Sequence, residues 1–94
     1  MLSKAKIKLI QSLELKKKRR EESLFVAEGP KVVGDLLPYF TCRMLVATAD
    51  WLGGHPFLQA DEIIEVTNEE LRKASFLKTP QVVLAVFELP SPFL

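Results

Sequence analysis

The sequence of 94 residues is poor in the residue types on which most catalytic and metal sites depend. It contains one cysteine, Cys42, and one histidine, His55. A single cysteine excludes an internal disulfide and favours a reducing compartment such as the cytoplasm. Two soft or imidazole ligands are too few for an ordinary zinc site, and a lone loop histidine is usually exposed rather than catalytic. The sequence therefore predicts no catalytic residue and no metal centre.

Phosphate-binding loops and membrane segments are also missing. Neither a Walker pattern nor GxGxxG occurs, and the two glycines of "LGGHP" lack the strand-to-helix context of a phosphate cradle. The longest apolar runs are a few residues, against roughly 20 for a bilayer span. The N-terminus lacks the apolar region of a signal peptide. We therefore expect one soluble domain without a bound cofactor or a membrane contact.

Positive charge is present in abundance, but only at the N-terminus. Residues 1–20 hold eight cations and one acid, a net charge of +7, whereas the remainder carries −6. Five of the cations are consecutive, in "KKKRR" at residues 16–20. Like charges this close repel one another, so a purely structural helix would normally intersperse acids. The asymmetry predicts a polyanionic partner.

Apolar periodicity alternates between helical and strand-like segments. The spacing predicts a first helix over residues 3–18, with Ser3 as its N-cap, and a capping box at Thr67 and Glu70. A loop is expected at residues 75–81. Strands are expected at 24–28, 43–47, 62–66 and 82–89, and the last one is apolar enough to be buried on both faces. This alternation predicts an α/β fold, a three-layer α/β/α sandwich around a largely parallel sheet of about four strands.

Glu28 ends the first expected strand, just before a turn at Gly29 and a helix that begins with Pro30. Two interpretations of its carboxylate are open. In the structural one, which the pattern favours, it accepts hydrogen bonds from backbone N–H groups at the start of that helix. In the functional one, it orients the neighbouring basic segment or an RNA group.

The segment "KTPQ" is a second candidate for binding. Lys78 supplies charge, Thr79 and Gln81 supply hydrogen-bonding side chains, and Pro80 stiffens the loop before the last strand. An ordinary turn explains the same residues equally well. If this loop and residues 16–20 fold side by side, they form one basic, polar surface for phosphate groups.

Taken in order, these segments resemble a known family. The pattern "IKLIQSL…KKKRREESLFVAEGPKVVGDLL", followed by "FLKTPQVVLAVFE", resembles the N-terminal substrate-binding domain of SpoU/TrmH-type RNA ribose 2′-O-methyltransferases. The matching positions are Ile7-Lys8, Lys17 to Arg20, Phe25 to Gly29, and Thr79-Pro80-Gln81. Ala5 and Lys18 replace an asparagine and an aromatic residue that are common in the family. The resemblance therefore implies recognition of the RNA backbone by charge.

The resemblance implies the fold of small ribosomal proteins that bind kink-turn RNA. It also implies a separate catalytic domain with a trefoil knot, which binds S-adenosylmethionine, methylates rRNA or tRNA, and forms the homodimer. On this basis we expect an RNA-binding domain over residues 1–89 and the start of a linker at 90–94, with no catalysis by this chain alone. The implied RNA-binding residues are Lys17, Lys18, Arg19, Arg20, Lys78, Thr79 and Gln81. The implied structural residues are Glu28, Gly29 and Pro80.

The residues by themselves leave two alternatives open. One is a free-standing, ribosome-associated RNA-binding protein of the same fold. The other is a protein-interaction module whose basic run meets an acidic partner. Neither the target RNA nor the nucleotide that is modified can be read from the pattern, because RNA recognition depends on shape and on single-stranded loops.

Overall fold

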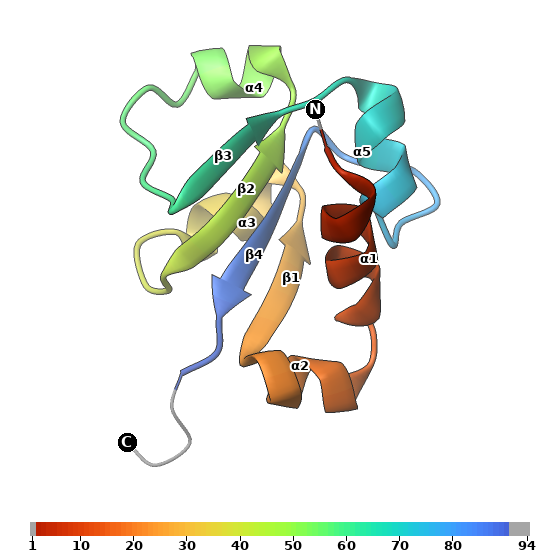
Figure 1. Cartoon of the computed structure of the whole chain (residues 1–94). Helices are drawn as coiled ribbons and strands as arrows, with labels where there is room; N and C mark the ends of the chain where they lie inside the picture. The colour runs from red at the N-terminus through yellow and green to blue at the C-terminus, as the bar shows by residue number, and fades with distance from the viewer. Residues whose placement is uncertain (1, 91–94) are drawn as a thin grey trace.

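The computed structural model describes residues 2–90, so the predicted linker at 90–94 lies, apart from its first residue, outside the described residues. Within this range the chain forms five helices and four strands (Figure 1). The helices are α1 (Lys4–Ser12), α2 (Lys16–Glu22), α3 (Pro30–Leu36), α4 (Ala49–Gly53) and α5 (Asn68–Ala74). The strands are β1 (Leu24–Glu28), β2 (Cys42–Ala47), β3 (Glu62–Glu65) and β4 (Val83–Glu88). All four predicted strands are present.

The sheet separates two layers of helices, as predicted for an α/β/α sandwich (Figure 1). Successive strand residues face opposite sides, so each strand contributes to both cores. On one side α1 and α5 pack on the sheet through Ile10, Leu13 and Leu71. On the other side α3 and α4 do so through Val33 and Trp51. All residues from 83 to 87 of β4 are buried, which confirms that this strand is covered on both faces.

The strand order is β1-β4-β2-β3. Only β2 and β3 are parallel, and β4 is antiparallel to both of its neighbours, so the prediction of a largely parallel sheet is wrong. The path of residues 75–82 explains this direction. The Gly29 N–H bonds the Val83 carbonyl at 2.9 Å, and the Thr48 N–H bonds the Val82 carbonyl at 3.0 Å. Since Gly29 and Thr48 directly follow β1 and β2, β4 starts at the edge where those strands end.

The predicted helix over residues 3–18 is wrong beyond the end of α1. Leu15 has an extended backbone, with φ −85° and ψ 129°, and a second helix begins after it. Nη1 of Arg19 donates hydrogen bonds to the carbonyls of Leu13 at 2.8 Å and Glu14 at 2.7 Å. Carbonyls at a helix end need such partners, so Arg19 stabilises the turn between α1 and α2. The cation run therefore lies on a helix of its own.

Local signals at the helix starts are confirmed. The Ser3 side chain accepts the Lys6 N–H at 3.2 Å and caps α1. Thr67 and Glu70 form the predicted capping box, with reciprocal bonds of 3.2 Å and 3.1 Å. Pro30 occupies the first turn of α3. Each of these motifs acts within a few residues, which is why the sequence alone identifies it.

The last strand ends close to where the first one begins. Leu24 pairs with Glu88, and the Leu89 N–H donates to the Ser23 carbonyl at 2.8 Å. Ser23 is the C-cap of α2. The chain therefore leaves the sheet beside the junction of α2 and β1.

Candidate nucleic-acid interface

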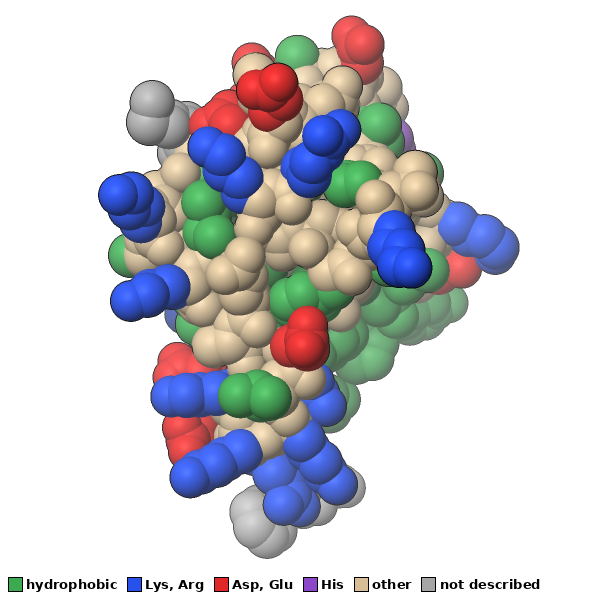
Figure 2. All heavy atoms as spheres, turned by 90° about the vertical axis from the view of Figure 1, so that its right-hand side faces the viewer, with side chains coloured by type: hydrophobic (Ala, Val, Ile, Leu, Met, Phe, Trp, Pro, Cys, Tyr) green, Lys and Arg blue, Asp and Glu red, His purple; other side chains and the backbone are tan. Residues whose placement is uncertain are grey.

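The basic side chains of α2 are mostly exposed to solvent. Lys16, Lys17, Lys18 and Arg20 are exposed. Among residues 2–90, an acid lies within 4.0 Å of only two of these four cations. Nζ of Lys17 lies 4.0 Å and that of Lys18 lies 3.4 Å from the Glu21 carboxylate. Such exposed pairs are worth little and leave the charge available. Figure 2 shows Lys and Arg side chains gathered over α2 at the lower end of the molecule.

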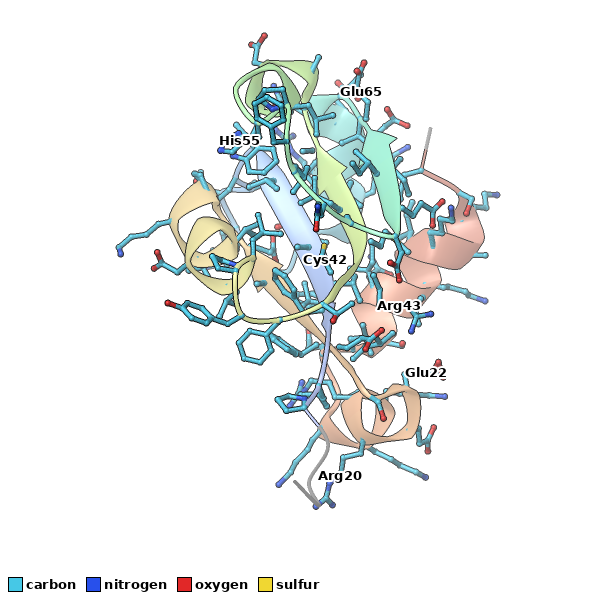
Figure 3. All side chains as sticks on the ribbon, turned by 90° about the vertical axis from the view of Figure 1, so that its left-hand side faces the viewer. Arg20, Glu22, Cys42, Arg43, His55 and Glu65 are labelled. Carbon is cyan, nitrogen blue, oxygen red and sulfur yellow. The ribbon has the colours of Figure 1, made fainter. Side chains whose placement is uncertain are left out.

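Arg20 points away from the body of the domain (Figure 3). It forms no ion pair with any residue between 2 and 90. A solvated guanidinium without an intramolecular partner suits contact with a phosphate, which it binds in a bidentate manner.

Arg19 differs from its neighbours on α2. Its side chain is half-buried and is held by the two carbonyls at the end of α1. This structural role was not evident from the sequence, because it depends on the chain turning between the two helices. A variant that removes Arg19 tests folding as well as RNA binding.

The Glu28 carboxylate is hydrogen-bonded within the domain, but its partners are not the predicted ones. It accepts a hydrogen bond from the Ser75 hydroxyl at 2.5 Å and another from the Phe76 N–H at 2.8 Å. The predicted partner, the start of α3, is therefore wrong. The side chain of Glu28 faces the side of the sheet that carries α1 and α5, and it ties the end of β1 to the loop after α5. The loop that contains the predicted "KTPQ" site is anchored in this way.

Gly29 needs the backbone freedom of glycine, because its φ is 100° and its ψ is 147°. A Cβ at this position would lie 3.5 Å from Cγ of Gln81. Gln81 therefore lies beside the end of β1. Lys78 and Thr79 are exposed in the same loop, and Pro80 is half-buried.

The two predicted RNA-binding segments lie at opposite ends of β1. α2 precedes the strand and the loop of residues 78–81 lies beside Gly29, which follows it. Five residues of strand separate them by about 16 Å. The single continuous surface considered from the sequence does not form. An RNA that touches both segments has to run along β1.

A hollow of about 310 Å³ lies along this route. It is lined by Leu13, Glu14, Arg19, Phe25, Val26 and Phe76. Phe76 is 36% exposed. Sequence reasoning missed this feature. The available signal was a phenylalanine, followed by Leu77, in a segment read as a loop.

The remaining candidates do not gather into a reactive site. Burial raises the pKa of the Cys42 thiol from 9.0 to about 11, so it is a poor nucleophile near neutral pH. His55 stacks on Trp51 with ring centroids 3.8 Å apart, and Figure 3 shows it at the opposite end of the molecule from Arg20. Among residues 2–90, no three His, Cys, Asp or Glu side chains are close enough to share a metal ion.

Among residues 2–90, no helix combines the length and the apolar character that a membrane crossing requires.

Comparison with known proteins gives a consistent result. The model of the family described as "MRM3-like substrate binding domain" matches residues 4–85. A solved structure from Porphyromonas gingivalis, assigned to the TrmH family of RNA methyltransferases, is 41% identical with a TM-score of 0.89. The AdoMet-bound rRNA methyltransferase of Sinorhizobium meliloti is 28% identical with a TM-score of 0.74. The SpoU methyltransferase AviRb of Streptomyces viridochromogenes, 20% identical with a TM-score of 0.75, supports the fold alone.

The matches cover nearly all of this chain but only part of each neighbour. The match to the Porphyromonas protein spans 97% of this chain and 37% of that protein. The match to the Sinorhizobium protein spans 98% of this chain and 36% of that protein, and the match to the Streptomyces protein spans 95% and 37%, respectively. The chain thus corresponds to a little over a third of the length of these proteins. No curated protein sequence matches it significantly.

Proposed function

Because the chain belongs to the MRM3-like substrate binding domain family, we propose that it binds RNA and presents it to the catalytic domain of a SpoU/TrmH-type RNA ribose 2′-O-methyltransferase. The observation that carries this proposal is the exposed cationic helix α2 on a domain of that family. Exposed cations release counterions from RNA when they contact phosphates, and this supplies most of the affinity of such surfaces.

RNA binding and catalysis belong to different domains in this proposal. Residues 1–89 bind RNA, and residues 90–94 begin the connection to a catalytic domain that forms the homodimer. The methyl donor is S-adenosylmethionine, bound by that other domain, as the AdoMet complex of the Sinorhizobium protein suggests. The Sinorhizobium protein is described as an rRNA methyltransferase. We therefore favour rRNA over tRNA as the substrate. We place the protein in the cytoplasm.

The contacts with RNA are expected from Lys17, Lys18 and Arg20 on α2, and from Lys78, Thr79 and Gln81 at the other end of β1. Arg19 contributes mainly by holding α2 in place. Gly29, Glu28 and Pro80 shape the second segment. No residue of this domain is expected to take part in methyl transfer.

The test is RNA binding as a function of salt. A fluorescein-labelled rRNA hairpin is titrated with the parent chain and with the triple variant Lys17→Ala, Lys18→Ala, Arg20→Ala, and anisotropy gives Kd. The variant leaves Arg19 in place, so the turn between α1 and α2 persists. We expect weaker binding at low salt, and a slope of log Kd against log salt that is smaller by about two to three.

A matched control removes three cations elsewhere, in the variant Lys31→Ala, Arg72→Ala, Lys73→Ala. This control lowers the net charge by the same amount as the α2 variant but leaves α2 intact. It should therefore keep most of the RNA affinity of the parent and most of the slope of log Kd against log salt. If the two variants lose affinity equally, the site is not on α2. If the parent shows no saturable binding at low salt, the proposed function itself is wrong.

A further inference from the structure

The hollow between α2, β1 and the loop after α5 has the dimensions and walls of a site for one flat group. Its volume, about 310 Å³, is at the lower end of the range for small-molecule pockets. Its apolar side chains come from Leu13, Val26 and Phe76. Phe25 also borders the hollow, but its ring packs with Phe40 and Phe87 on the other side of the sheet. Figure 2 shows apolar side chains exposed between the basic end of the molecule and the rest of the body. An apolar opening beside a cationic helix suits a ligand that combines a flat ring with a phosphate.

Two planar groups border this hollow: the backbone of one and the side chain of the other are hydrogen-bonded within the domain. The backbone of Phe76 is fixed by its N–H bond to Glu28, at 2.8 Å. The guanidinium of Arg19 is fixed by its bonds to the carbonyls of Leu13 and Glu14. Aromatic rings and guanidinium planes are the groups on which proteins stack unpaired RNA bases. Holding them in advance lowers the entropy lost on binding.

Glu14 decides what kind of group fits. It contributes the one carboxylate among the lining residues, and it forms no ion pair with any residue from 2 to 90. A carboxylate accepts hydrogen bonds and repels phosphate. Guanine alone among the four RNA bases presents two neighbouring donors, N1–H and the exocyclic N2 amine, on its Watson–Crick edge. The other bases place an acceptor next to their donor, which a carboxylate disfavours.

We propose that this hollow takes one guanine, unstacked from the RNA, between Phe76 and Arg19, with its Watson–Crick edge on Glu14. The exposed cations of α2 hold the flanking phosphates. The proposal rests on the proposed function, since it needs the domain to bind RNA. It adds base selectivity to a surface whose charges alone recognise only the backbone.

The experiment uses labelled RNA hairpins with one stem and a uridine loop whose central nucleotide is guanosine, inosine, adenosine or uridine. Inosine lacks only the N2 amine of guanosine, so the pair isolates one hydrogen bond. The proteins are the parent, Phe76→Leu, Glu14→Gln and, as a matched control, Phe57→Leu. Phe57 is 92% exposed, lies in the loop after α4 and is not among the residues that line this hollow. Fluorescence of Trp51 checks that each variant is folded.

We expect the parent to bind the guanosine hairpin at least about fivefold more tightly than the inosine hairpin. Phe76→Leu should weaken binding of the guanosine hairpin by about tenfold. Glu14→Gln should remove the preference over inosine, and Phe57→Leu should behave like the parent. If the parent binds all hairpins equally and the variants match it, the guanine site is wrong although the RNA-binding function stands. If no hairpin binds at low salt, both are wrong.

Discussion

The bond between Glu28 and the loop after α5 offers the most direct test of how this domain holds its shape. Replacing Glu28 with alanine removes the acceptor for the Ser75 hydroxyl and for the Phe76 N–H. Nothing else in the described part of the chain takes its place. The end of β1 and the start of the loop are then no longer joined. The loop of residues 75–82 should loosen, and the direction of β4 depends on its path.

The size of the effect follows from the two bonds. A hydrogen bond to a charged group contributes about 1.5–3 kcal/mol when it is shielded from water. The Ser75 bond is partly buried, but the Phe76 N–H is exposed and water can replace its acceptor. We therefore expect Glu28→Ala to lower the free energy of unfolding by about 2 kcal/mol. For a domain of this length that corresponds to a fall in Tm of roughly 8–16 °C.

The assay is urea unfolding followed by the fluorescence of Trp51, the single tryptophan, which is a buried residue of α4 on the other side of the sheet. Glu65→Ala is the matched control, because Glu65 also ends a strand but is exposed (Figure 3). Combining Glu28→Ala with Ser75→Ala should give a coupling energy of about 1 kcal/mol. Equal unfolding midpoints for Glu28→Ala and Glu65→Ala would refute the reasoning.

Two further predictions concern backbone strain and a buried thiol. Gly29→Ala should lower the free energy of unfolding by about 2 kcal/mol, because a backbone with φ 100° and ψ 147° is adopted almost exclusively by glycine. Thermal unfolding measures this loss of stability, and an unchanged Tm would contradict the observed turn. Burial raises the pKa of Cys42 from 9.0 to about 11, so the unfolded chain loses this proton first as pH rises. Stability should therefore fall between pH 9.0 and about 11, by ~2 kcal/mol, and level off above. The fall should be smaller in Cys42→Ala, measured by urea unfolding at both pH values, and an identical fall in the two proteins would exclude the thiol as its source.

The strands were predictable because their signals are local. The apolar run at 82–89 is too continuous for a surface element, and Gly29-Pro30 marks both a turn and a helix start. The direction of β4 was not predictable in this way. It depends on the path of residues 75–82, and that path is set by contacts with Glu28 and Thr48, which are distant in the sequence.

The candidate interface was predictable in its charges but not in its geometry. Consecutive cations are costly to bury, so the exposure of Lys17 and Arg20 follows from composition. Arg19 has the same charge, yet it is held by two carbonyls because the chain turns before α2. The break carries no proline or glycine, so no local signal marks it. Phe76 becomes a candidate binding residue only because it lines a hollow, and the hollow is formed by segments that are distant in the sequence.

The antiparallel course of β4 also determines where the chain goes next. Because the Leu89 N–H is hydrogen-bonded to the Ser23 carbonyl, the backbone leaves the sheet at the C-terminal end of the cationic helix α2. A catalytic domain joined after Pro90 would be tethered within a few residues of the bound RNA. A short tether turns the meeting of substrate and catalyst into an intramolecular event, whose effective concentration depends on the length of the connection. Such a domain would need no surface of its own that fits this one, because the tether alone would keep the RNA within its reach.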